Sequence, residues 1–77
     1  MTYKEFKSES ERAIIRNGIQ FKYTKLSEYH YILIISFRTL QHTNDYGVSY
    51  DWEDATTTLT SIQAYESYCN LLNGGLN

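Results

Sequence analysis

Residues 29–38 read Tyr29-His30-Tyr31-Ile32-Leu33-Ile34-Ile35-Ser36-Phe37-Arg38, and they form the longest apolar run in the chain. β-Branched and aromatic residues favour strands, and the run is too short to span a membrane. Successive side chains of a strand point to opposite faces. The odd-numbered residues therefore form one continuous apolar face, which we predict to face the core. The even-numbered face is apolar only in its middle, at Ile32 and Ile34.

Two shorter segments complete the predicted sheet. Residues 19–24 alternate apolar and polar side chains, as a half-buried strand does, and a three- or five-residue loop would join them to the long run with matching faces. Residues 40–47 contain Asn44, Asp45 and Gly47 and are predicted to be a turn. Residues 48–53 again alternate, which predicts a third strand with its even-numbered side chains on the core and its acidic side chains outside. Ile35 is then expected to be buried against Phe21, Trp52 and the helices.

A helix is predicted on each side of this sheet. The spacing of Thr2 and Glu5 is typical of a capping box. Residues 4–16 place apolar side chains at helical spacing, and Asn17-Gly18 resembles a helix stop. The second helix is expected to begin at Asp54 or at one of the threonines after it, with a short strand over residues 56–60 as the alternative. Its predicted apolar stripe consists of Leu59, Ile62, Tyr65, Cys69 and Leu72.

These elements predict a single α+β domain over residues 1–77. The order is an N-terminal helix, a three-stranded antiparallel meander and a C-terminal helix. A sheet must bury its apolar face, so both helices are expected on the same face of the sheet.

Charge is divided unevenly along the sequence. Residues 1–38 contain all seven lysines and arginines and four carboxylates, whereas residues 39–77 contain five carboxylates and no lysine or arginine. Such asymmetry is typical of a surface that meets a charged partner. The amino end lacks the apolar core of a signal peptide, and a lone cysteine fits a reducing compartment, so we expect the protein in the cytoplasm.

The sequence carries no recognisable catalytic or cofactor motif. The two histidines, His30 and His42, fall on the non-core face and in the predicted turn, and Cys69 falls on an apolar stripe, where it is expected to be a small core residue. A zinc site needs three or four convergent ligands. We therefore expect no metal, no cofactor and no enzymatic activity.

Three functions are compatible with this pattern. The first is a protein-binding module whose acidic, Tyr-rich surface inhibits a nucleic-acid-binding enzyme. Its expected contact residues are Asp45, Tyr46, Tyr50, Asp51, Glu53 and Asp54. In size, tyrosine content and acidity the chain is similar to small acidic inhibitors encoded by phages and mobile elements, and this resemblance implies an anti-defence role.

The other two functions use other surfaces. A homo-oligomeric structural or accessory protein would associate through the even-numbered sheet face, at Ile32 and Ile34 with Lys22 on the rim. Direct nucleic-acid binding would use Lys22, Lys25 and Arg38. The net charge of −2 argues against this third function.

Overall fold

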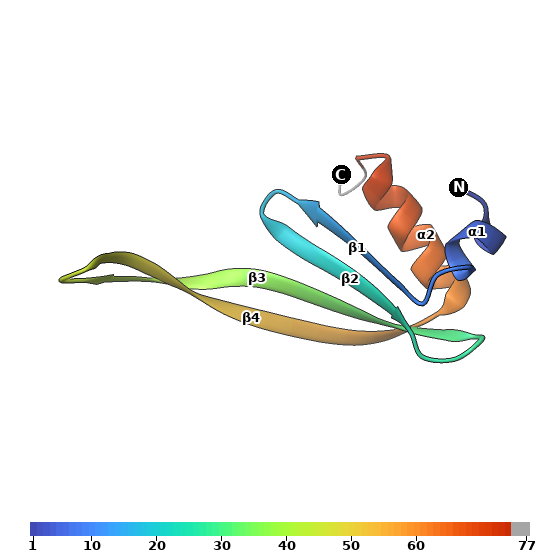
Figure 1. The fold of residues 1–77 in the computed structure, drawn as a ribbon, viewed down its shortest axis with the longest axis horizontal. Helices are drawn as coiled ribbons and strands as arrows, with labels where there is room; N and C mark the ends of the chain where they lie inside the picture. Colours follow the sequence, from blue (N-terminus) through green and yellow to red (C-terminus); the bar gives the residue numbers. More distant parts are fainter. Residues whose placement is uncertain (75–77) are drawn as a thin grey trace.

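The computed structural model describes residues 1–74, except for the side chains of residues 40, 41, 42 and 44. It is an α+β fold with a four-stranded antiparallel sheet in the order β1-β2-β3-β4. The elements are α1 (Tyr3–Lys7), β1 (Glu11–Arg16), β2 (Ile19–Lys25), β3 (His30–Asn44), β4 (Gly47–Thr60) and α2 (Ser61–Leu72). Each strand pairs with the next one along the chain, and both helices lie on the same side of the sheet (Figure 1).

The prediction of one helix over residues 4–16 is wrong beyond Lys7. Thr2 caps α1 as predicted, because its hydroxyl accepts a hydrogen bond from the backbone N–H of Glu5 at 3.1 Å. The chain then leaves the helix at Ser8 and forms β1. Asn17 and Gly18 are the two-residue turn of the β1–β2 hairpin, with φ values of 53° and 77°. An Asn-Gly pair favours this turn because both residues tolerate positive φ.

The last two strands are longer than predicted. The predicted turn over residues 40–47 contracts to Asp45 and Tyr46, because β3 continues to Asn44 and β4 begins at Gly47. β4 also includes residues 56–60, so the strand alternative for that segment is correct. The helix that follows is capped by Thr60 and Gln63, which form a reciprocal capping box, and not by Asp54.

A β-bulge determines which side chains of β4 face the core. In the outer part of the hairpin, odd residues of β3 lie opposite even residues of β4, as in Thr43 opposite Val48. The register then shifts by one residue between Arg38 and Leu40. Below the bulge, odd residues lie opposite odd residues, as in Ile35 opposite Ala55. The expected packing of Trp52 against Ile35 is therefore wrong: Trp52 pairs with Arg38 and is 60% exposed.

The core lies between the odd-numbered face of β2 and β3 and the two helices. Phe6 of α1 is fully buried, and its ring lies 6.3 Å from that of Tyr23, 5.0 Å from that of Tyr31 and 5.5 Å from that of Tyr68. Edge-on and tilted aromatic pairs of this kind stabilise a core beyond their buried area. Ile35 pairs with Phe21 as expected but is only half-buried.

The helix α2 turns a different stripe to the core from the one predicted. Its buried residues are Ser61, Ala64, Tyr68 and Leu71. Ile62 and Leu72 of the predicted stripe are exposed, and Cys69 is half-buried. Ser61 is buried because its hydroxyl donates to the carbonyl of Glu28 at 2.8 Å and its N–H donates to the carbonyl of Tyr29 at 2.8 Å.

Two buried tyrosines give a matched test of this core. The hydroxyl of Tyr23 shares a hydrogen bond of 2.7 Å with Ser67, whereas the buried hydroxyl of Tyr31 has no hydrogen-bond partner among the described residues. Burial raises the pKa of both phenols. Tyr23→Phe should lower the free energy of unfolding by about 0.5–1.5 kcal/mol, and Tyr31→Phe should raise it by about 1 kcal/mol. Urea unfolding of the two variants measures both, and a loss of stability in Tyr31→Phe would contradict the assignment.

Candidate interaction surface

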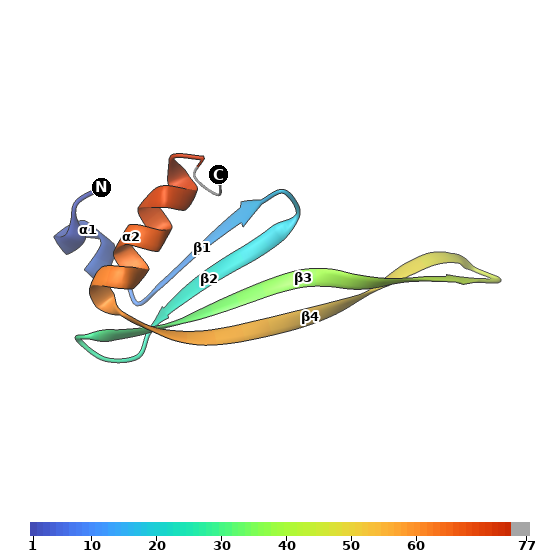
Figure 2. The same cartoon turned by 180° about the vertical axis from the view of Figure 1, so that it is seen from behind.

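A two-stranded arm extends from the sheet beyond the bulge. It comprises residues 40–51, from the Leu40–Asp51 pair to the Asn44–Gly47 pair. Figures 1 and 2 show that the helices lie at the other end of the molecule, so the arm is covered on neither face. The arm accounts for the elongated shape, with principal extents of 51 × 24 × 18 Å.

Large apolar and aromatic side chains are exposed on the arm and at its base. Tyr46 at the tip is 99% exposed, and Val48 and Tyr50 are also exposed. The guanidinium of Arg38 lies 4.7 Å from the centre of the Tyr50 ring, so Tyr50 and Arg38 share a face. By strand alternation Trp52, Tyr50 and Val48 lie on the face of the sheet that carries no helix. The predicted contact residues Tyr46 and Tyr50 are thus both on the arm.

The predicted acidic residues are divided between the two faces. Asp45 lies at the tip. Asp51 and Glu53 lie on the odd-numbered side of β4, which is the helix side. Asp54 lies on the opposite face, where its carboxylate accepts a hydrogen bond of 2.6 Å from the Ser36 hydroxyl. The structure therefore joins Asp51 and Glu53 in one surface and separates Asp54 from them.

A groove continues the helix side of the sheet toward α2. It has a volume of about 550 Å³ and an apolar floor that includes Leu33, Ile35 and Leu59. Gln63 and Glu66 of α2 line its wall. The groove exists because α2 leaves part of the sheet uncovered, which is why Leu33 and Ile35 are only half-buried.

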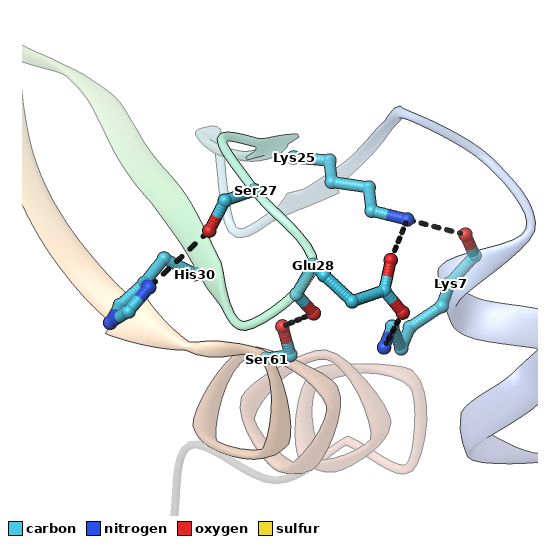
Figure 3. Close-up of polar contacts among 6 residues, drawn as sticks. All are labelled: Lys7, Lys25, Ser27, Glu28, His30 and Ser61. Carbon is cyan, nitrogen blue, oxygen red and sulfur yellow. Dashed lines mark hydrogen bonds and ion pairs between the residues drawn. The ribbon is translucent and has the colours of Figure 1, made fainter.

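The basic residues are largely neutralised within the first half of the chain. Figure 3 shows Glu28 between Lys7 and Lys25. Its carboxylate forms an ion pair with each, at 3.5 Å for Lys25. Lys22 pairs with Glu11 at 3.4 Å. Four of the basic residues of the first half, Lys7, Arg12, Lys22 and Lys25, thus pair with carboxylates of residues 9–28, whereas neither Glu53 nor Glu66 belongs to an ion pair among the described residues.

The residues of the two other hypotheses lie as follows. Ile32, Ile34 and Lys22 share the helix-free face, where all three are half-buried and Ile15 of β1 is 72% exposed. Lys22 and Arg38 lie on this face, whereas Lys25 lies on the helix side beside Glu28. The three cations proposed for nucleic-acid binding therefore do not form one patch.

Neither a metal site among the described residues nor a similar protein indicates what this surface binds. No group of three or more potential metal ligands occurs within the described residues, and none of their helices is long and apolar enough to cross a membrane. No known protein family matches the chain, and no curated protein or solved structure shows significant similarity to it.

Sequence reasoning missed Val48 and Trp52, which it assigned to the core. The even-length turn correctly predicted that odd residues of β3 lie opposite even residues of β4 within the arm, but Val48 and Trp52 face away from the helices and not into the core. The bulge reverses that relation at the base, and no residue in the sequence marks it. Gly47, with a φ of 124°, marks only the turn.

Trp52 is the single tryptophan and reports directly on this arrangement. Because the indole is 60% exposed, its fluorescence should be quenched readily by acrylamide in the native protein and should shift little on unfolding. A blue-shifted native emission that resists quenching would instead place Trp52 in the core.

Glu28 predicts a pH dependence of stability. The hydrogen bond from Lys7, followed by the charge of Lys25, lowers the pKa of its carboxyl below the ordinary value of 4.5. A lowered folded-state pKa stabilises the protein above the unfolded-state pKa, and this stabilisation is lost as pH falls through the folded-state value. Wild type should therefore exceed Glu28→Gln in free energy of unfolding at neutral pH, and the difference should shrink below about pH 4.5.

Urea unfolding of both proteins from pH 7 to pH 3 measures this difference. Glu66→Gln removes a carboxylate that is in no ion pair among the described residues, and it controls for the loss of one charge. A difference that is unchanged across this range would mean that the pairs of Glu28 do not contribute to folding.

Proposed function

We propose that this protein is a non-enzymatic protein-binding module that presents the arm and its base to a basic surface of a partner. The proposal rests on the arm, in which β3 and β4 continue beyond the rest of the sheet. Its exposed side chains are aromatic, apolar and acidic. None of its described side chains belongs to the buried core. An exposed group of large apolar side chains is costly in a soluble protein and is typical of an interaction site.

The two kinds of side chain on the arm supply different parts of binding. Tyr46, Tyr50 and Trp52 are of the residue types that dominate binding energy at protein interfaces. Asp45 lies at the tip, and Asp51 and Glu53 lie on the opposite face of the same strand; these carboxylates would favour a partner rich in lysine and arginine. Charges of this kind mainly increase the association rate and select the partner. The carboxylates would therefore increase the rate of association with the partner, and the aromatic rings would provide most of the binding energy.

A nucleic-acid-binding enzyme is the partner class that best fits this chemistry. Its binding cleft is basic because it must neutralise phosphates, and a narrow acidic ribbon could occupy such a cleft. The similarity in size and composition to small inhibitors from phages and mobile elements supports an inhibitory role. On this proposal the protein competes with nucleic acid for the enzyme.

Shortening the arm tests the proposal without touching the core. Residues 41–50 are replaced by Asn-Gly, so that a two-residue turn joins Leu40 to Asp51. Tagged wild type and the shortened variant are then used to capture partners from a lysate, and captured proteins are challenged with added nucleic acid. The proposal predicts that the shortened variant keeps a cooperative thermal transition and loses the partner. Equal capture by both proteins would contradict it.

Charge is tested separately once a partner is identified. The variant Asp51→Asn with Glu53→Gln should associate more slowly at low salt and show a flatter salt dependence, because salt screens the attraction it removes. The matched control, Glu5→Gln with Glu9→Gln, changes the net charge equally at the opposite end of the molecule. If both variants slow association to the same extent, the effect reflects total charge and not the arm.

A further inference from the structure

The outer edge of β4 carries unpaired backbone groups at known positions. Ser61 donates its N–H to the carbonyl of Tyr29, the residue directly opposite in the β3–β4 register. Hydrogen-bonded and non-hydrogen-bonded pairs alternate along an antiparallel ladder. The odd-numbered residues of β4 below the bulge therefore bond to β3, and the N–H and C=O groups of Asp54, Thr56 and Thr58 point away from the sheet.

The hydrogen bonds between β2 and β3 support the same alternation of bonded and outward-pointing residues. Leu26 donates its N–H to the carbonyl of His30, which makes the even-numbered residues of β3 the ones that bond to β2. The odd-numbered residues of β3 are then left for β4. At the end of β4, the N–H of Thr60 is satisfied by the side chain of Gln63 at 3.1 Å. The open part of the edge thus ends before Thr60.

This edge lacks the features that usually prevent strand addition. Natural proteins protect edge strands with lysine, proline, bulges or covering elements. β4 contains no lysine and no proline, and the bulge of the hairpin lies on β3. Neither helix covers the edge in Figure 1 or Figure 2. The opposite edge differs, because β1 is six residues long and carries Glu11, Arg12 and Arg16.

We propose that β4 pairs antiparallel with β4 of a second copy of this chain, about a two-fold axis at Thr56. In this register Thr56 lies opposite its own counterpart, Asp54 lies opposite Thr58, and Trp52 lies opposite Thr60. Threonine pairs across strands are favourable, and like charges directly opposite are not. Moving the axis two residues toward the arm would place Asp54 opposite Asp54, so the charge pattern selects the threonine-centred register.

The same geometry explains why the occupant is a second copy and why assembly stops at two. The stretch from Ala55 to Leu59 is uncharged, so it offers no charge for a basic strand to recognise. In the register about Thr56 a second copy brings its own threonines against this stretch, and no two carboxylates lie opposite each other. An interface made of the same patch on both copies is closed, and the short, charged edge of β1 is not suited to extend it. The product is an eight-stranded sheet with its two arms pointing in opposite directions. This assembly does not depend on the proposed function.

Proline at Thr56 tests the proposal. Thr56→Pro deletes an N–H that points away from β3, and proline is tolerated at such edge positions. The matched control Thr56→Val keeps the N–H and the β-branched shape. Sedimentation velocity over a wide concentration range should show a monomer–dimer equilibrium for wild type and Thr56→Val. Thr56→Pro should dimerise about tenfold more weakly or not at all, because each copy loses one hydrogen bond, and two bonds of about 0.7 kcal/mol together make the roughly 1.4 kcal/mol that corresponds to tenfold.

Hydrogen exchange provides a test that needs no variant. In wild type, the amides of Thr56 and Thr58 should exchange more slowly as concentration rises, whereas Thr57, whose N–H bonds to β3, should be protected at every concentration. A protein that is monomeric at all concentrations would overturn the proposal. So would a dimer that persists in Thr56→Pro but dissociates in Ile34→Lys, because that dimer would use the helix-free face and not the edge.

Discussion

The register between β3 and β4 is the constraint on which the surface of this protein depends. One extra residue of β3 at the bulge between Arg38 and Leu40 changes which side chains of β4 share a face with the core. Below it, Ala55 and Leu59 lie on the helix side; beside it, Trp52 lies on the helix-free face. A one-residue change of register moves every side chain of a strand to the other face. The bulge therefore decides that Trp52 is a surface residue and that the arm displays its apolar side chains and its carboxylates on separate faces.

The body of the fold depends on a second feature, the packing of three aromatic rings around Phe6. Tyr23 and Tyr31 come from the sheet and Tyr68 from α2, so this group joins elements that are distant in sequence. α1 has only five residues, too few for a helix to be stable alone. Its place is therefore maintained by the Thr2 cap and by burial of Phe6. Because this packing is concentrated at one end of the sheet, the arm can extend from the other end without support from the helices.

Local sequence patterns predicted the central strands β2 and β3 well and the edge strands β1 and β4 poorly. Alternation in residues 19–24 and 29–38 identified two central strands, their even-sum register and the core face that contains Tyr23 and Tyr31. It misassigned β1, because Phe6, Ala13 and Ile14 also recur at helical spacing and Asn17-Gly18 is compatible with both a helix stop and a hairpin turn. Asn-Gly directly before the alternating residues 19–24 should have favoured the hairpin. The bulge could not be predicted, since no residue in the sequence marks it. The acidic residues were treated as one surface because the third strand was expected to end at Glu53; β4 continues through Asp54, which therefore lies on the face opposite Glu53.

The position of α2 after β4 also affects how the protein is made. Every strand pairs with its sequence neighbour, so the sheet consists of local contacts that form quickly. Tyr23 and Tyr31, however, acquire their cover only when residues 61–72 have left the ribosome. During translation the meander therefore exists for a time with its apolar face and its open β4 edge both exposed, which is a state prone to aggregation. The capping box of Thr60 and Gln63 stabilises the first turn of the helix that must form before this face is covered.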